Sequence, residues 1–266
     1  MSTVAKSTIE VLGGTVGYRR QGSGEALVVL AGAWLTNKDL ELYSRLADTF
    51  EVIVPDLPGF GQTDIPEFYS SFADTVIHLD TLFDELGLTT VHLVGHGFGG
   101  WVAAEYAVSH PSRLSSLSLL APWGLRPNEG EPLVNMFRTT PDEEFALLLG
   151  DDVQAYFSVL VPDPAELMAD SFQERTAIAR VAWNPRYDIK LEHYLARVTA
   201  PTLVLIPETD RVVAPSVAVR YAAALHTSPV VISSASGSGT EHLFILQQPD
   251  SVADAISTVA HSGTRA

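Results

Sequence analysis

The chain has 266 residues and a formal net charge of −16, from 32 acidic and 16 basic side chains, and it contains no cysteine. Such a charge repels phosphate backbones and anionic membranes, so neither nucleic acid nor membrane is expected as a partner. The missing cysteines exclude disulfides, thiolate metal sites and a cysteine nucleophile, and the length suits one α/β domain with an inserted subdomain, or at most two domains.

The sequence offers no targeting or membrane signal. The run from Met1 to Lys6 lacks the apolar core of a signal peptide, and no apolar stretch reaches the roughly 18 residues of a membrane span. We therefore expect a soluble cytoplasmic protein that is a monomer or a homodimer.

The N-terminal half alternates apolar runs with amphipathic segments of helix length. Residues 8–21 predict a hairpin that turns at Gly13 and Gly14. The later apolar runs are continuous rather than alternating, which is typical of parallel strands covered on both faces. The pattern predicts strands over 26–30, 51–55, 91–94 and 114–120, and helices over 37–48, 71–86 and 98–109.

The character of the chain changes between about Pro122 and Val198, where the patterns are mainly helical and no strand is clear. Strands then return over 201–206 and 229–232, and helices over 215–225 and 249–261. We therefore predict an α/β fold, a doubly wound and mostly parallel sheet. Its core is expected to comprise residues 1–123 and 198–266, and residues 124–197 are expected to form a helical cap that roofs the active site.

A glycine-rich turn at residues 95–100 follows a predicted buried strand and opens a predicted helix. This is the frame of a nucleophile elbow, Gly-x-nucleophile-x-Gly, with Gly95 and Gly99 as the outer glycines. The nucleophile position is Gly97, which has no side chain. The stretch lacks the Lys-Ser/Thr of a phosphate-binding loop and does not fit the Gly-x-Gly-x-x-Gly of a dinucleotide turn.

Four further motifs lie in a fixed order around the elbow. They are Leu-Ala-Gly-Ala-Trp at 30–34, Asp-Leu-Pro-Gly-Phe-Gly at 56–61, Pro-Glu-Thr-Asp at 207–210, and His242 with Pro249 seven residues on. With the elbow they cover nearly the whole chain, which resembles the α/β-hydrolase superfamily. This resemblance implies the fold predicted above and an enzyme that acts on a carbonyl compound without a cofactor.

The resemblance also implies roles for individual residues. Gly97 occupies the nucleophile position, His242 is the general base, and Asp210 holds the histidine tautomer and stabilises the imidazolium. The amides of Phe98 and Ala33 form the oxyanion hole. His96 precedes the nucleophile position, where a structural role is expected.

Gly97 leaves three interpretations open, because no acyl-enzyme can form there. The chain is a serine hydrolase inactivated at its nucleophile, or a natural enzyme in which Asp210 and His242 perform acid–base chemistry without a covalent step, as in a lyase, cyclase or isomerase. In the third interpretation it is a ligand-binding pseudoenzyme. The retained Asp210 and His242 argue against the third interpretation. Natural divergence is favoured by Ala31, where the superfamily usually has His, and by Pro207 and Glu241, where it usually has Gly.

The substrate is expected between the elbow and the cap, in a pocket that suits a small apolar carbonyl-containing molecule. The bond attacked is an ester, a lactone or a carbon–carbon bond next to a ketone, and the fold does not choose among them. No His, Asp and Glu cluster has the spacing of metal ligands, so no metal is expected. The predicted substrate-binding residues are Trp34, Trp123, Phe137 and Trp183, with Phe98, Met136 and Phe157 as further candidates and Arg126 and Arg138 as candidate partners of a substrate carboxylate.

Overall fold

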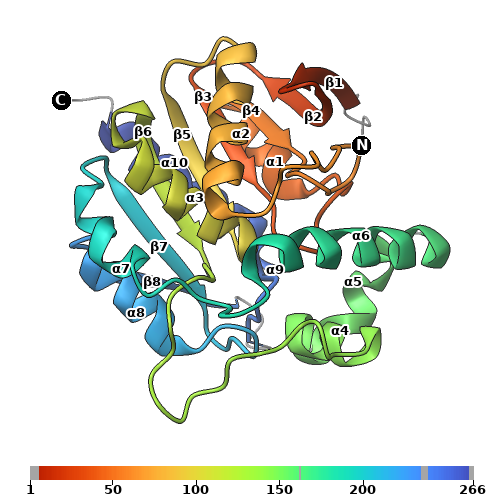
Figure 1. Ribbon diagram of the computed structural model, residues 1–266. Helices are drawn as coiled ribbons and strands as arrows, with labels where there is room; N and C mark the ends of the chain where they lie inside the picture. Colours follow the sequence, from red (N-terminus) through yellow and green to blue (C-terminus); the bar gives the residue numbers. More distant parts are fainter. Residues whose placement is uncertain (1–5, 162, 235–238, 264–266) are drawn as a thin grey trace.

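The computed structural model describes residues 6–161, 163–234 and 239–263 of the chain. Its centre is an eight-stranded sheet with the strand order β1-β2-β4-β3-β5-β6-β7-β8 (Figure 1). Strand β2 is antiparallel to both of its neighbours, and all other neighbouring strands pair in parallel. The strands are β1 (Lys6–Val11), β2 (Gly14–Gly22), β3 (Ala26–Leu30), β4 (Glu51–Pro55), β5 (Val91–His96), β6 (Leu114–Leu120), β7 (Thr202–Pro207) and β8 (Pro229–Ile232).

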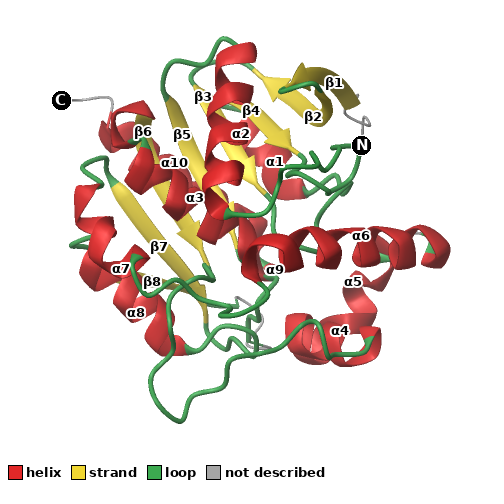
Figure 2. Cartoon of the chain, in the orientation of Figure 1, coloured by secondary structure: helices red, strands yellow, loops and turns green. Residues whose placement is uncertain are grey.

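Helices cover the sheet on both faces, as Figure 2 shows. Helices α2 and α3 pack together on one face, whereas α1 and α10 pack together on the other (Figure 1). All six residues of β5 are buried between these layers, which explains the continuous apolar runs. The helices are α1 (Glu41–Ala47), α2 (Phe72–Glu85), α3 (Phe98–Ser109), α4 (Pro141–Leu149), α5 (Val153–Leu160), α6 (Pro164–Ala182), α7 (Leu191–Tyr194), α8 (Pro215–Ala224), α9 (Phe244–Gln247) and α10 (Pro249–Gly263).

The predicted α/β class and the mostly parallel sheet are confirmed. The helix expected over 37–48 is wrong in its first residues, since α1 begins only at Glu41. Asn37 has a φ of 62°, and this left-handed conformation cannot lie inside an α-helix. The residues between β3 and α1 form a loop instead, and this loop reaches the candidate site.

Helices α4 to α7 all lie between β6 and β7 in the sequence, in a stretch of residues 121–201 that we call the helical segment. Helices α4, α5 and α6 stand together beside the sheet, beyond the carboxyl ends of its central strands (Figures 1 and 2). The exact division into a core and a cap stays a prediction. Among the residues that the structure describes, no helix is long and apolar enough to cross a membrane.

Candidate active site

The turn between β5 and α3 is built around glycines that no larger residue can replace. A Cβ on Gly95 would lie 2.4 Å from the carbonyl oxygen of Gly99, and a Cβ on Gly99 would lie 2.2 Å from that of Leu30. Both distances are far inside van der Waals contact. The strand and the helix therefore approach as closely as they do because positions 95 and 99 carry no side chain.

Gly97 sits at the tip of this turn, as the N-cap of α3, with φ 55° and ψ −117°. Its amide donates to the carbonyl oxygen of Leu120 at 3.0 Å, which ties the turn to the end of β6. A Cβ at this position would lie 3.2 Å from Nε2 of His242 and 3.5 Å from Nε1 of Trp123. The missing side chain would thus have faced two polar nitrogens.

His242 and Asp210 form a hydrogen-bonded pair. His242 Nδ1 lies 3.0 Å from Oδ2 and 3.2 Å from Oδ1 of Asp210. The loop after β7 fixes the carboxylate, since its Oδ1 accepts hydrogen bonds from the amides of Val212 and Val213, each at 2.8 Å. His242 itself is 1% exposed. This arrangement leaves Nε2 of His242 as the ring nitrogen that faces Gly97.

His96 supports His242 through a hydrogen bond to its backbone. Its Nε2 lies 2.9 Å from the carbonyl oxygen of His242, and because a carbonyl only accepts, this nitrogen carries the proton. Burial lowers the pKa of His96 to about 3, helped by the charge repulsion of His242, so the ring is neutral at neutral pH. The structure therefore places His96 in a supporting position, with Gly32 packed so closely that a Cβ there would lie 2.7 Å from His96 Nδ1.

The loop after β3 brings Ala33 and Trp34 to the same end of the sheet, where both are buried. Phe98 is the first residue of α3, and the first amides of a helix have no partner within it. The amide of Trp34 does have a partner, because it donates to Oε2 of Glu174 on α6 at 3.0 Å. The oxyanion roles of Ala33 and Phe98 stay predictions.

Two buried glutamates of the helical segment hold Trp34. The indole Nε1 of Trp34 donates to Oε2 of Glu144 on α4 at 3.1 Å. Oε1 of Glu144 accepts from the hydroxyl of Thr139 and forms an ion pair with Arg175. Burial raises the pKa of Glu174 to about 7, against the lowering effect of its hydrogen bonds from Thr36 and Trp34.

Neither glutamate is marked by a motif in the sequence. Glu144 belongs to an acidic run at the start of a helix, where Glu143 closes a capping box with Thr140, and such residues are usually solvated. Glu174 sits in a helix whose mean hydropathy is neutral. No local pattern distinguishes a buried carboxylate from an exposed one here.

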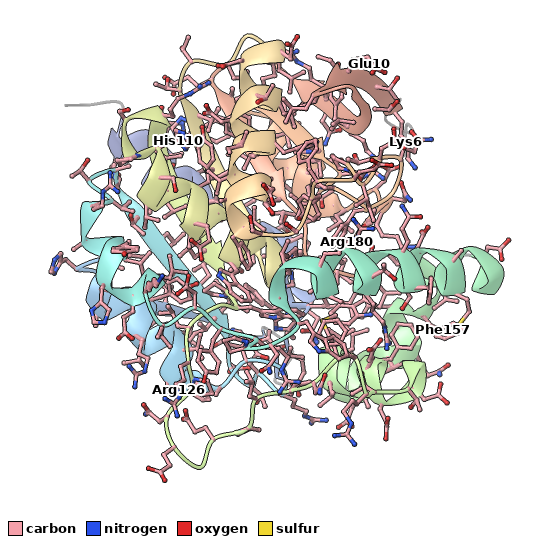
Figure 3. The ribbon with its side chains drawn as sticks, in the orientation of Figure 1. Lys6, Glu10, His110, Arg126, Phe157 and Arg180 are labelled. Atoms are coloured by element: carbon pink, nitrogen blue, oxygen red, sulfur yellow. The ribbon has the colours of Figure 1, made fainter. Side chains whose placement is uncertain are left out.

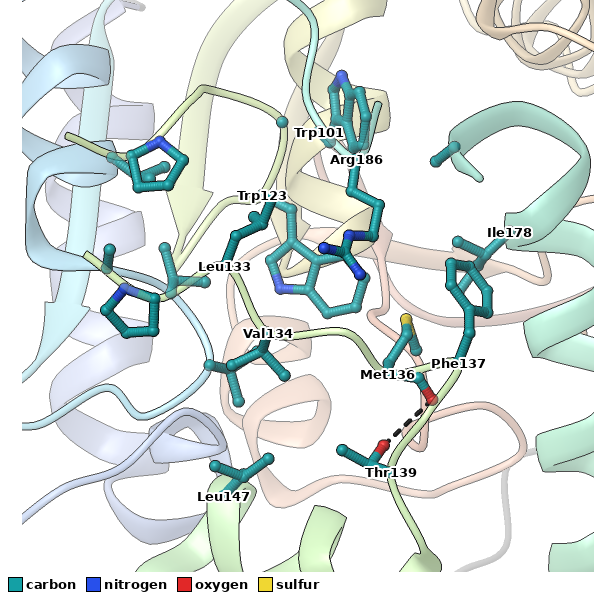
Figure 4. Close-up of a pocket in the computed structure, with 18 of the residues that line it drawn as sticks. Trp101, Trp123, Leu133, Val134, Met136, Phe137, Thr139, Leu147, Ile178 and Arg186 are labelled. Atoms are coloured by element: carbon teal, nitrogen blue, oxygen red, sulfur yellow. Dashed lines mark hydrogen bonds between the residues drawn. The ribbon is translucent and has the colours of Figure 1, made fainter. Parts of the chain in front are cut away.

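A mainly apolar cavity lies between the helical segment and the strand ends (Figure 4). Gly97 and His242 do not line it. Trp34 and Trp123 do, with ring centroids 6.4 Å apart, and Trp123 also contacts the Gly97 position. The other lining residues are Trp101, Gly124, Leu125, Pro127, Pro132, Leu133, Val134, Met136, Phe137, Thr139, Glu144, Leu147, Leu148, Ile178, Ala182, Arg186, Val212, Val213, Ala214 and Val217.

The structure separates the predicted pocket residues into two groups. Trp34, Trp123, Phe137 and Met136 line the cavity. Trp183 does not, since it is 62% exposed and lines a second, more open hollow while it packs against Phe137 with ring centroids 4.9 Å apart. The difference arises because Trp183 follows the last residue of α6 and faces outward from that turn.

Four other predicted residues also lie outside the cavity. Phe98 is buried, with its ring stacked on that of Phe60. Phe157 is exposed on α5, where its ring meets Phe145. Arg126 stacks over the ring of Tyr187, and Arg138 is exposed (Figure 3 labels Arg126 and Phe157). The arginine that does line the cavity is Arg186, which the sequence reasoning missed. Within the described ranges no group of three His, Asp or Glu side chains could hold a metal ion.

The comparisons with known proteins agree with this geometry. A family model described as "Alpha/beta hydrolase family" matches residues 27–255. The 2-hydroxy-6-oxononadienedioate/2-hydroxy-6-oxononatrienedioate hydrolase 2 of Pseudomonas putida is 28% identical over 238 residues, which cover 79% of this chain and 80% of that protein.

Solved structures show the same fold. The enol-lactonase from Burkholderia xenovorans LB400 has a TM-score of 0.77 at 16% identity, over 96% of this chain and 100% of that one. The meta-cleavage product hydrolase from Pseudomonas fluorescens IP01 has a TM-score of 0.73 at 20% identity, over 97% of this chain and 98% of that one. Because the family model spans most of the sequence, this chain belongs to the alpha/beta hydrolase family and is a hydrolase of that fold.

Proposed function

We propose that this protein hydrolyses an ester, a lactone or a ketone-adjacent carbon–carbon bond in a small apolar molecule, with water rather than a serine hydroxyl as the attacking group. The observation that carries the proposal is the position of His242. Its Nε2 lies 3.2 Å from the place of the missing Cβ of Gly97, and its Nδ1 is held by Asp210. This geometry supports His242 as a base, held by Asp210, beside the position that the nucleophile would occupy.

The proposed reaction needs one proton acceptor and one oxyanion site. A water at the Gly97 position gives its proton to Nε2 of His242 as its oxygen attacks the substrate carbonyl carbon. Asp210 stabilises the imidazolium, and the amides of Phe98 and Ala33 stabilise the oxyanion. When the tetrahedral intermediate collapses, His242 returns the proton to the leaving oxygen or carbon, so no covalent intermediate with the protein forms.

Two further features support a carbonyl substrate. The cavity beside Trp123 is mainly apolar, and the indole Nε1 of Trp123 is buried with no hydrogen-bond partner among the described residues. A buried donor without a partner is costly, and a water or a carbonyl oxygen beside Gly97 would satisfy it. The Pseudomonas putida relative is named as a hydrolase of 6-oxo compounds, in which a ketone is present.

The second candidate is a serine hydrolase whose nucleophile has been replaced by glycine. The close packing at Gly95 and Gly99 and the positive φ of Gly97 keep the frame of a serine elbow, which favours this alternative. Loss of such a nucleophile costs about 10⁶ in kcat and leaves a residual acceleration of about 10³–10⁴ over water. The two candidates therefore differ in how the rate responds to a restored hydroxyl.

The test compares four proteins on p-nitrophenyl esters and lactones: the chain itself, Gly97→Ser, Gly97→Ala as the control without a hydroxyl, and His242→Ala. Turnover by the chain itself that disappears in His242→Ala, with no adduct by intact mass, is the result that we expect. Turnover gained only by Gly97→Ser, together with labelling by a fluorophosphonate, would instead identify an inactivated serine hydrolase. Saturable binding with no turnover in any form would make the protein a ligand binder.

A further inference from the structure

Arg186 is a cation in a cavity whose other charge is already neutralised. Among the residues that the structure describes, two charged side chains line the cavity, Glu144 and Arg186. The carboxylate of Glu144 is occupied by its ion pair with Arg175 and by hydrogen bonds from Thr139 and Trp34. The cavity is therefore left with one surplus positive charge.

The guanidinium of Arg186 makes no hydrogen bond or ion pair with the part of the chain that the structure describes. Figure 4 shows that the side chain extends toward Trp123. Arg186 also lines the second, more open hollow beside Trp183, so it lies between the two. The residue is only partly exposed. A half-buried arginine gains from a partner that its five N–H donors can hold, and a planar carboxylate matches their fork in two parallel hydrogen bonds.

Backbone hydrogen bonds connect the segment that carries Arg186 to the segment that carries Trp123. Tyr187 forms a β-bridge with Gly124, and the amide of Asp188 donates to the carbonyl oxygen of Gly124 at 2.7 Å. The segment that carries Arg186 is thus fastened directly to the residue that follows Trp123. An anionic group held by Arg186 and a carbonyl group near Trp123 would therefore lie in the same cavity.

We propose that Arg186 is the anion-binding residue of this cavity and that the substrate is an apolar carbonyl compound with one carboxylate group. The inference rests on the proposed function and narrows its substrate class. The surrounding protein carries a net charge of −16, so an unpaired arginine inside an apolar pocket selects an anion against the general repulsion of the surface. Among the described residues, Arg186 is the one basic side chain that lines the cavity, which suits a monoanion.

The experiment measures binding without turnover, by titration calorimetry and by the fluorescence of the cavity tryptophans. The probes are 3-phenylpropionate and 3-phenylpropionamide, which differ in charge but hardly in shape. The unaltered chain should prefer the carboxylate by about 10-fold or more, in line with a charge-assisted hydrogen bond. Arg186→Gln should lose that preference and bind the amide as before.

The matched control is Arg126→Gln, which removes the same charge from an exposed arginine that stacks on the neighbouring Tyr187. It should keep the preference for the carboxylate. Equal loss in both variants, or no preference in the unaltered chain, would overturn the role of Arg186. A preference for the carboxylate that depends on Arg186, without turnover in any form, would support the anion site and refute the proposed hydrolysis. Turnover of neutral esters without such a preference would support the hydrolysis and refute the anion site.

Discussion

The amide of Trp34 donates a hydrogen bond to Oε2 of Glu174 at 3.0 Å, and this contact joins the loop after β3 to helix α6 of the helical segment. Trp34 has a φ of 68°, so the loop holds a non-glycine residue in a left-handed conformation at the point of contact. Such a conformation persists only where the surroundings fix it. The helical segment therefore takes part in shaping the loop that carries the predicted oxyanion amide of Ala33.

Glu174 should make the stability of the fold depend on pH. Its pKa is raised from 4.5 to about 7, chiefly by burial. Between these values the unfolded chain releases the proton while the folded chain keeps it, so the free energy of unfolding should fall as the pH rises, by about 1.4 kcal/mol per pH unit at most, and then level off. Below pH 4.5 both states are protonated and the effect vanishes.

The measurement is urea unfolding of the unaltered chain and of Glu174→Gln between pH 4.5 and pH 8, a range that spans both pKa values of this residue. Glutamine can still accept from the amide of Trp34 but does not titrate. Glu105, whose pKa is also raised to about 7, is present in both proteins and cancels in the difference. Parallel stability curves for the two proteins would show that Glu174 does not titrate as described.

The indole of Trp34 should be coupled to Glu144. Trp34→Phe removes the N–H that donates to Glu144 and leaves a buried carboxylate oxygen without this donor, at an expected cost of about 1–3 kcal/mol in the free energy of unfolding. A double-mutant cycle with Glu144→Gln should give a coupling energy of about 0.5–3 kcal/mol. Trp101→Phe is the control, because its indole donates to Glu105 instead and should show no coupling to Glu144.

The elbow and the Asp210–His242 pair could be predicted because each depends on a short motif. Glycines at 95 and 99 are required by the close approach of β5 and α3, and that requirement is visible in the sequence as Gly-x-Gly-x-Gly. Asp210 follows a predicted strand, and parallel strands end at one edge of the sheet. The structure indeed brings Asp210 to His242, although the catalytic roles of both stay predictions.

Glu144, Glu174 and Arg186 could not be predicted in the same way. All three come from the helical segment. The burial of the two glutamates depends on how α4 and α6 pack against the loop that contains Trp34, and the position of Arg186 depends on the bridge between Tyr187 and Gly124. Periodicity shows which face of a helix is apolar but not which acidic residue finds an indole or an amide as its partner. The same limit explains why Trp183, an apolar residue at a helix end, is exposed rather than in the cavity.

Asp210 should matter for activity far more than for stability. Asp210→Asn keeps an oxygen that can accept from the amides of Val212 and Val213, so the loop should stay folded. The amide cannot stabilise an imidazolium, and a loss of about 10⁴ in kcat is expected in whichever form of the protein turns over. The control is Glu208→Gln in the same loop. The carboxylate of Glu208 accepts a hydrogen bond from the amide of Ser234, whereas that of Asp210 is paired with His242. Near-normal kcat in Asp210→Asn would remove this residue from the mechanism.

Substitution at Gly97 should cost stability whether or not it restores activity. Position 97 has φ 55° and ψ −117°, which a residue with a Cβ adopts only under strain of about 1–3 kcal/mol. The new Cβ would also press on Nε2 of His242 at 3.2 Å. Gly97→Ala and Gly97→Ser should therefore be destabilised by similar amounts in urea unfolding, because only the hydroxyl distinguishes them.

Gly95→Ala is the reference for a true steric clash at the same turn, since its Cβ would meet backbone of Gly99 at 2.4 Å and Ala103 Cβ at 2.8 Å. It should be destabilised well beyond either substitution at Gly97. If Gly97→Ser proved markedly more stable than Gly97→Ala, its hydroxyl would have gained a hydrogen bond with His242 or Trp123. That result would show that the site can still hydrogen-bond a serine hydroxyl at position 97. Equal stabilities would mean that the side chains around Gly97 offer no hydrogen bond to such a hydroxyl.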